Sequence, residues 1–138
     1  MRALVLTVLL AACGETVDLP LPADYTSWGH IEVSGEVPGH GNTFRIIYAN
    51  PLATDPTQPR YQEGSMLIKE IYDREGGTLK TIEAMRRDGD GVPALQNEGD
   101  WLYATIGRDG TATHKDLCWN RCHVAAPYNG AWYDYRGL

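Results

Sequence analysis

The alternation of apolar and polar residues predicts a chain built mainly from short strands. Residues 43–49, 65–72 and 101–106 are rich in β-branched and aromatic side chains and are bounded by turn-forming residues, as strands usually are. Residues 79–87 are ambiguous between strand and helix. We interpret them as the hairpin partner of residues 65–72, because only the turn residues 73–77 separate the two segments.

Helices are expected near the two ends of the domain. Residues 24–31 resemble a short opening helix that Asp24 can cap, and residues 118–126 resemble a second helix that stops at Pro127. Residues 49–62 contain three prolines and are expected to form a loop with at most one helical turn. The predicted fold class is therefore α+β, with an antiparallel β-sheet of about four to five strands, an N-terminal helix and a C-terminal helix.

The strand at residues 65–72 carries two unusual charges. Strand alternation makes both of its faces largely apolar and places Lys69 at the centre of one face and Glu70 at the centre of the other. Charged side chains are rarely buried unless they are paired or functional. Arg45 on the preceding apolar strand is a similar case. Lys69 and Glu70 have a structural alternative, in which each extends its charged end to solvent or pairs with a neighbour such as Arg45 or Glu83. The alternative for Arg45 is a salt bridge to Glu70 or Glu83.

Length and charge limit the function. A chain of 138 residues is expected to form one domain. A formal net charge of −6 leaves no basic patch, so neither nucleic acid nor adsorption to anionic lipid is expected.

The N-terminal residues predict export. Arg2 precedes an apolar run, Ala3–Leu10, that is too short to cross a bilayer. The run leads into Leu-Ala-Ala-Cys, which resembles a bacterial lipoprotein signal and makes Cys13 the lipidation site. The alternative is an ordinary secretory signal with a coincidental cysteine.

An acylated cysteine would fix the location of the protein. Gly14 is not the aspartate associated with inner-membrane retention, so we expect a periplasmic protein anchored by lipid to the outer membrane. The predicted division of the chain is a signal peptide at residues 1–12, a tether at 13–22 and a folded domain at 23–138.

The segment Cys-Trp-Asn-Arg-Cys-His carries the most specific chemistry. Cys118 and Cys122 can take up the vinyl groups of haem, and His123 can bind its iron. The usual spacing for covalent haem is Cys-x-x-Cys-His, and this chain has one extra residue between the cysteines. A methionine or histidine as sixth iron ligand would favour electron transfer, whereas an open position would bind small ligands. The candidates for that sixth ligand are Met66, Met85, His30, His40 and His114.

Three other interpretations of the cysteines remain open. A Cys118–Cys122 disulfide suits an oxidising compartment, although residues four apart on a helix are awkwardly placed to form one. A zinc site that uses both cysteines and His123 lacks a fourth ligand at zinc-like spacing. The motif could also be a remnant in which the extra residue ended haem attachment.

From Asp24 to Tyr135 the sequence resembles the cytochrome P-460 domain family of exported bacterial haem proteins. The pieces that carry the resemblance occur in order along the chain: Asp-Tyr-Thr-Ser-Trp at 24–28, His40, Arg-Ile-Ile-Tyr-Ala-Asn at 45–50, Gly-Ser-Met-Leu-Ile-Lys-Glu-Ile-Tyr at 64–72, Ile-Glu-Ala-Met-Arg at 82–86, Gly-Asp-Trp at 99–101, the cysteine motif, and Asp-Tyr at 134–135. The resemblance implies an antiparallel sheet with flanking helices, one covalent haem c per chain on the C-terminal helix, and a homodimer.

The resemblance also implies a reaction. Family members that oxidise hydroxylamine carry an additional covalent link from a lysine to haem, and Lys69 is the candidate here. Members of the cytochrome c′-beta branch lack this link and bind gases such as nitric oxide at a five-coordinate iron. Lys69, Glu70 and Arg45 are thus the candidate catalytic residues, and Arg45 could neutralise a haem propionate or orient a bound anion.

The function expected from the sequence is an exported mono-haem c-type cytochrome that binds or oxidises a small nitrogenous molecule, hydroxylamine or nitric oxide. A redox partner protein is a further expected partner. The alternatives are an electron-transfer cytochrome with a methionine sixth ligand and a haem-free binding or structural lipoprotein. The chain departs from the family pattern twice, in the longer cysteine spacing and in Arg136-Gly137-Leu138, where apolar residues usually follow the final Asp-Tyr.

Overall fold

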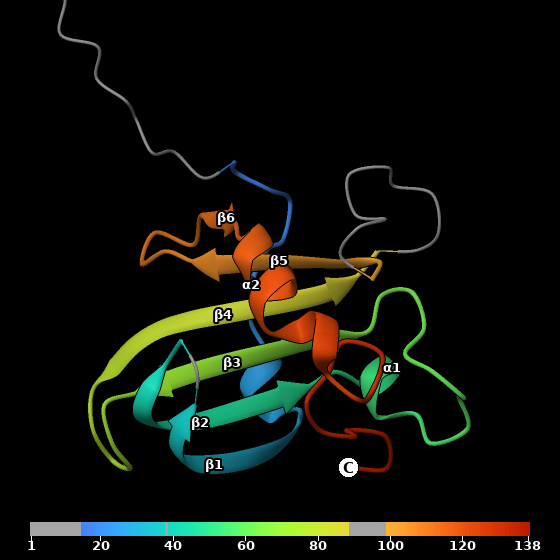
Figure 1. Ribbon diagram of the computed structural model, residues 1–138, viewed down its shortest axis with the longest axis horizontal. Helices are drawn as coiled ribbons and strands as arrows, with labels where there is room; N and C mark the ends of the chain where they lie inside the picture. The colour runs from blue at the N-terminus through green and yellow to red at the C-terminus, as the bar shows by residue number, and fades with distance from the viewer. Residues whose placement is uncertain (1–14, 38, 89–98) are drawn as a thin grey trace, which may run out of the picture.

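Six antiparallel strands form a single sheet in the computed structural model, which describes residues 15–37, 39–88 and 99–138 (Figure 1). Each strand pairs with the next in the chain, so the sheet order is β1-β2-β3-β4-β5-β6. The elements are η1 (Tyr25–Ser27), β1 (Gly29–Val37), β2 (Gly41–Ala49), α1 (Pro51–Thr54), β3 (Met66–Tyr72), β4 (Leu79–Arg87), β5 (Trp101–Ile106), β6 (Ala112–His114), α2 (Asp116–Arg121) and η3 (His123–Ala125).

The four predicted strands are confirmed, but the predicted number of strands is too low. The strands β2, β3, β4 and β5 lie where the sequence placed them, and β4 is the hairpin partner of β3. The short β6 was not predicted. The expected N-terminal helix at residues 24–31 is wrong: only the three-residue 3-10 turn η1 is helical, and from Gly29 the chain belongs to β1. Ile31 and Val33 are half-buried between exposed neighbours, which is the pattern of a strand.

The expected C-terminal helix is divided into two pieces. The helix α2 ends at Arg121, Cys122 has non-helical backbone angles of φ −128° and ψ −59°, and η3 continues to Ala125. The expected helical turn within residues 49–62 is α1, whose N-terminus is capped because the Asn50 side chain accepts a hydrogen bond from the Ala53 amide.

The sheet separates two cores, one on each face. Residues 15–28 run across one face, whereas α2, η3 and residues 128–138 lie over the other (Figure 1). The strand β3 contributes to both: Met66 and Ile68 belong to the first core and Leu67 to the second, as the alternation predicted.

Residues 15–22, within the predicted tether, pack against the sheet. Thr16 forms a bridge with Thr113, and the Val17 amide donates to the Ala112 carbonyl at 3.0 Å. Leu19 is only 1% exposed. The predicted signal peptide at residues 1–12 and the lipidation site at Cys13 lie outside the described residues. Within the described ranges, no helix is both long and apolar enough to cross a membrane.

Candidate functional site

A cavity of about 380 Å³ lies between the second face of the sheet and the C-terminal part of the chain. This volume is in the range of small-molecule sites, roughly 300–1,000 Å³. The sheet side is formed by Arg45 and Ile47 of β2, Leu67 and Lys69 of β3, Glu83 and Met85 of β4, and Tyr103 of β5. The helix α2, the Cys122–His123 junction and residues 131–135 contribute the opposite side.

The cysteine motif brings all three of its reactive side chains to this cavity. Cys118, Cys122 and His123 line it together. Residues four apart on a helix lie on the same side of that helix, and the Cys122 amide still donates to the Cys118 carbonyl. The extra residue is therefore accommodated by a full helical turn that ends at Arg121. No disulfide joins the two cysteines.

The His123 imidazole is oriented by a backbone carbonyl. Its Nδ1 lies 2.6 Å from the Gly130 carbonyl oxygen, and because a carbonyl only accepts, Nδ1 carries the proton and Nε2 carries the lone pair. The ring packs against Tyr103 with centroids 5.0 Å apart. Burial lowers the pKa of His123 below its usual 6.5. The neutral imidazole with a free Nε2 is the form that binds metals.

Gly130 holds this carbonyl in a turn that tolerates no side chain. Its φ is +91°, and an added Cβ would lie 2.9 Å from the Trp101 indole nitrogen. Trp101 is fully buried, and its indole N–H donates to the Asn129 carbonyl at 2.7 Å. This contribution of Gly130 was not predicted from the sequence. The Asn129-Gly130 pair is a turn signal, but it does not indicate that the turn faces His123.

Lys69 lies in a polar cluster at the edge of the cavity. Lys69 and Glu83 are direct cross-strand partners, and the Lys69 Nζ lies 2.7 Å from a Glu83 carboxylate oxygen and 3.1 Å from the His40 Nε2. Burial, followed by the charge of Lys69, lowers the pKa of His40. The neutral His40 thus accepts a hydrogen bond from the Lys69 ammonium. The expected structural alternative for Lys69, an ion pair with Glu83, is present.

Arg45 is a buried cation with no carboxylate partner among the described residues. It is 3% exposed, and NH1 donates to the Thr43 hydroxyl at 3.2 Å. The alternative salt bridges to Glu70 and Glu83 do not form. A buried guanidinium that faces a cavity is stabilised by an anionic group there.

The structure does not bring Glu70 to the cavity. Alternation turns its side chain to the opposite face of the sheet, where it is 6% exposed. Its carboxylate accepts hydrogen bonds from the hydroxyls of Tyr25 at 2.5 Å, Tyr72 at 2.8 Å and Tyr48 at 3.3 Å. Lys69 and Arg45 therefore share the cavity, whereas Glu70 belongs to a separate tyrosine cluster.

The candidate sixth iron ligands are also divided between the two faces. Met85 and His40 line the cavity, and Met66 lies in the other core. His30 packs against Tyr48, and the His114 Nδ1 lies 3.1 Å from the Tyr103 carbonyl. Only Met85 and His40 of the five candidates face the cavity.

The donor set fits haem better than a protein-ligated metal ion. Within residues 15–37, 39–88 and 99–138 no three side chains of His, Cys, Asp or Glu form a metal-binding cluster, which argues against zinc. Two thiols, a neutral imidazole with a free Nε2 and a buried arginine instead surround one apolar-walled cavity. These groups can attach haem through thioethers, bind its iron and compensate the charge of a propionate.

The chain matches the model of a known protein family. The family is described as Cytochrome P460, and the match covers residues 22–131. No curated protein is significantly similar to it.

Proposed function

Because the chain belongs to the cytochrome P-460 family, we propose that it is an exported mono-haem c-type cytochrome that binds or oxidises hydroxylamine or nitric oxide. One observation carries the proposal: Cys118, Cys122 and His123 line the same cavity, and the Gly130 carbonyl leaves the His123 Nε2 free to bind iron.

The residues of the motif would hold the cofactor. The thiols of Cys118 and Cys122 would hold haem through thioether bonds, and the Nε2 of His123 would bind its iron. Bound haem would supply an iron that takes up a small ligand or removes electrons from it. The guanidinium of Arg45 would compensate the charge of a propionate or orient an anion.

Lys69, Glu83 and His40 provide the acid–base groups of the cavity. The ammonium of Lys69 is a proton donor, held in place by a carboxylate oxygen of Glu83 and by the Nε2 of His40. The His40 imidazole is neutral and can receive a proton at Nε2. A nucleophilic lysine must be uncharged, and an ammonium paired with Glu83 is not. This arrangement supports Lys69 as a hydrogen-bond donor rather than as a cross-link to haem.

Haem attachment is tested by expressing the chain with a haem-attachment system and recording its absorption after denaturing purification. We expect a Soret band in the wild type, its loss in Cys118→Ala/Cys122→Ala, and its retention in the control Cys13→Ser, which removes the thiol outside the motif. A wild-type protein without a Soret band would refute covalent haem.

The reaction is tested on the haem-loaded protein. We expect nitric oxide to change its spectrum, and we expect hydroxylamine to reduce an artificial electron acceptor if the protein is an oxidase. A spectrum that neither molecule alters would overturn the assigned ligand class. A far-red-shifted ferrous Soret band that disappears in Lys69→Ala would assign the cross-link instead.

The electron-transfer alternative rests on Met85, the methionine that lines the cavity. A low-spin spectrum with a methionine–iron band, lost in Met85→Leu, would favour it. A low-spin spectrum that is lost in His40→Gln would instead identify His40 as the sixth iron ligand.

Export, a lipid anchor on Cys13 and a homodimer complete the proposal. Radioactive palmitate should label the wild type but not Cys13→Ser, and sedimentation of the domain should give the mass of a dimer. A wild type that palmitate does not label would refute the lipid anchor, and a monomeric mass would refute the homodimer.

A further inference from the structure

The segment from Tyr128 to Leu138, which we call the strap, forms one wall of the cavity. Ala131, Trp132, Tyr133 and Tyr135 of the strap line it. Ala131 and Tyr135 are buried at 1% and 3% exposure, whereas Trp132 and Tyr133 are 48% and 40% exposed. The middle of the strap therefore faces both the cavity and the solvent.

The Tyr61 hydroxyl pins the strap on both sides of Asp134. It donates to the Tyr133 carbonyl at 3.2 Å and accepts from the Tyr135 amide at 3.0 Å. Tyr61 is 2% exposed, and its ring packs edge-on against Trp101 with centroids 5.6 Å apart. A single hydroxyl on a rigid ring thus satisfies two backbone groups of the strap.

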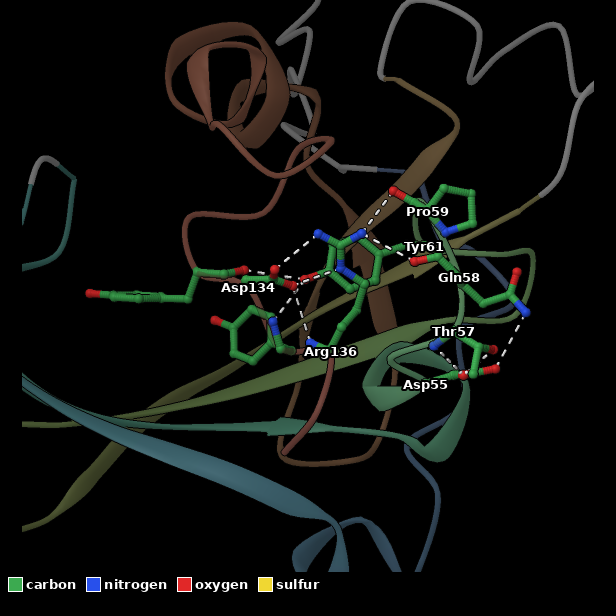
Figure 2. A network of polar contacts seen from close by, with 9 residues as sticks. Asp55, Thr57, Gln58, Pro59, Tyr61, Asp134 and Arg136 are labelled. Atoms are coloured by element: carbon green, nitrogen blue, oxygen red, sulfur yellow. Dashed lines mark hydrogen bonds and ion pairs between the residues drawn. The ribbon is translucent and has the colours of Figure 1, made fainter.

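Arg136 ties the strap to the loop after α1 (Figure 2). Its Nε and NH2 donate to the two Asp134 carboxylate oxygens at 2.7 and 2.9 Å. Its NH1 donates to the carbonyls of Pro59 at 2.7 Å and Gln58 at 3.2 Å. The guanidinium carbon lies 5.8 Å from the centre of the Tyr61 ring. One side chain therefore joins the strap, the loop and Tyr61.

The loop that receives Arg136 is itself ordered. The Asp55 carboxylate accepts from the backbone amide and the hydroxyl of Thr57 at 2.9 and 2.7 Å, and from the side-chain Nε2 of Gln58 at 3.4 Å (Figure 2). Beyond Arg136, the Gly137 amide donates to the Thr54 carbonyl at 2.8 Å. The strap is thus anchored to a fixed support rather than to a second loose segment.

We propose that Tyr61 and Arg136 are positioning residues that hold the strap closed and so limit the size of the ligand that enters the cavity. The proposal rests on the proposed function, in which this cavity holds haem and takes up a small ligand. Neither residue is placed among those that line the cavity, so each acts through Trp132 and Tyr133. Loosening these bonds opens the exposed middle of the strap first, because Ala131 and Tyr135 remain packed in the core.

The variants separate the parts of this arrangement. Tyr61→Phe removes only the hydroxyl and keeps the ring. Arg136→Ala removes all the guanidinium contacts, and Arg136→Lys keeps the charge but has no planar fork. The matched control is Arg74→Ala, which removes another arginine paired with a neighbouring aspartate, at an exposed turn outside the cavity lining.

The first measurement is amide hydrogen exchange in the haem-loaded protein. We expect the amides of residues 133–137 to exchange about threefold to tenfold faster in Tyr61→Phe and Arg136→Ala, as the net loss of one or two hydrogen bonds predicts. Arg136→Lys should lie between these variants and the wild type, and Arg74→Ala should match the wild type. Unchanged exchange in both Tyr61→Phe and Arg136→Ala would overturn the proposal.

The second measurement separates ligand access from general stability. The ferrous protein is mixed with carbon monoxide and with n-butyl isocyanide, which is bulkier. We expect the association rate of the isocyanide to rise by about threefold or more relative to that of carbon monoxide in Tyr61→Phe and Arg136→Ala. If the ratio of the isocyanide rate to the carbon monoxide rate equals that of the wild type while the amides of the strap exchange faster, the contacts of Tyr61 and Arg136 affect only stability, and the proposal is overturned.

Failure of the proposed function has a different signature. A wild type without covalent haem fails the absorption test, whatever the strap does. Access is then measured on the same chain from the alkylation of Cys118 and Cys122 by iodoacetamide and by bulkier N-phenylmaleimide. If the maleimide rate rises more than the iodoacetamide rate in Tyr61→Phe, the strap limits access to the cavity. An unchanged ratio of the two rates refutes the proposal.

Discussion

Replacing Glu70 by alanine should lower the free energy of unfolding by about 3 kcal/mol, although Glu70 does not line the cavity. The side chain is 6% exposed, and its carboxylate accepts short hydrogen bonds from the hydroxyls of Tyr25 and Tyr72 at 2.5 and 2.8 Å. Truncation would leave both hydroxyls, together with that of Tyr48, without their partner in a partly buried cluster.

The magnitude follows from the number of good hydrogen bonds. A hydrogen bond to a charged group contributes about 1.5–3 kcal/mol. Taking the lower value for Tyr25 and Tyr72, and nothing for Tyr48 at 3.3 Å, gives about 3 kcal/mol. Glu70→Gln keeps the volume and one acceptor oxygen, so its cost should be about 1 kcal/mol. A domain with a typical 5–15 kcal/mol of stability would remain folded in both variants.

Urea unfolding followed by tryptophan fluorescence and circular dichroism measures these differences. The matched control is Glu75→Ala, at an exposed carboxylate in the turn after β3. A second assay is the alkaline titration of tyrosine absorbance. Burial, and then the bond to Glu70, raises the pKa of Tyr72 to about 12 from its usual 10.0, and this pKa should fall in Glu70→Ala.

The raised pKa of Tyr72 makes the stability of the protein depend on pH. A tyrosine whose pKa is raised on folding contributes stability that is fully present below about pH 10 and is lost between pH 10 and about 12. Glu70→Ala should therefore flatten the fall in stability across this range. A Glu70→Ala protein within about 0.5 kcal/mol of Glu75→Ala would refute the reasoning, because buried hydrogen bonds of this kind cost more to leave unmade.

Two further predictions concern the cavity. Gly130→Ala should lower the free energy of unfolding by at least about 1 kcal/mol, since the residue has a left-handed φ and its Cβ would meet Trp101. Urea unfolding measures this loss. A weaker iron–histidine Raman band in the haem-loaded protein would report that the Gly130 carbonyl, which accepts from His123, is displaced. The pKa of His40 is lowered by burial and by the charge of Lys69, so His40 contributes stability that is present above pH 6.5 and is lost as pH falls through its folded pKa. The wild type should therefore lose more stability than His40→Gln between pH 7 and pH 5, and equal losses would contradict the burial of a neutral imidazole.

The strands were predictable where apolar runs are continuous. Residues 101–106 form such a run and match β5 residue for residue. Residues 79–87 also match β4, but their own pattern was ambiguous and the turn at 73–77 decided the assignment. The strand β1 was missed because Gly35 interrupts its alternation and because its start was assigned to a helix. The three residues of β6 are too few to produce a pattern.

The candidate site was predictable where side-chain type carries the chemistry. Residue type and spacing singled out Cys118, Cys122 and His123, which the structure places at one cavity, and strand alternation alone separated Lys69 from Glu70. The Gly130 carbonyl and the strap could not be predicted in this way. A backbone carbonyl carries no residue-specific signal, and the contacts of Tyr61 and Arg136 join segments more than 70 residues apart.

The opposite placement of Lys69 and Glu70 has a consequence for how β3 finds its partners. Both faces of β3 are apolar, so its hydrophobic pattern does not by itself distinguish the native pairing from one shifted by a single residue. Such a shift would move the Glu70 carboxylate into the cavity and the Lys69 ammonium among the tyrosine hydroxyls, and it would separate Lys69 from Glu83. Lys69 would be buried without the carboxylate of Glu83, and Glu70 would lose the tyrosine hydroxyls that donate to it, and a buried charge that loses its partners is strongly unfavourable. The two charges thus encode the alignment of the central strands, and an apolar replacement of both would be expected to give a sheet with competing registers.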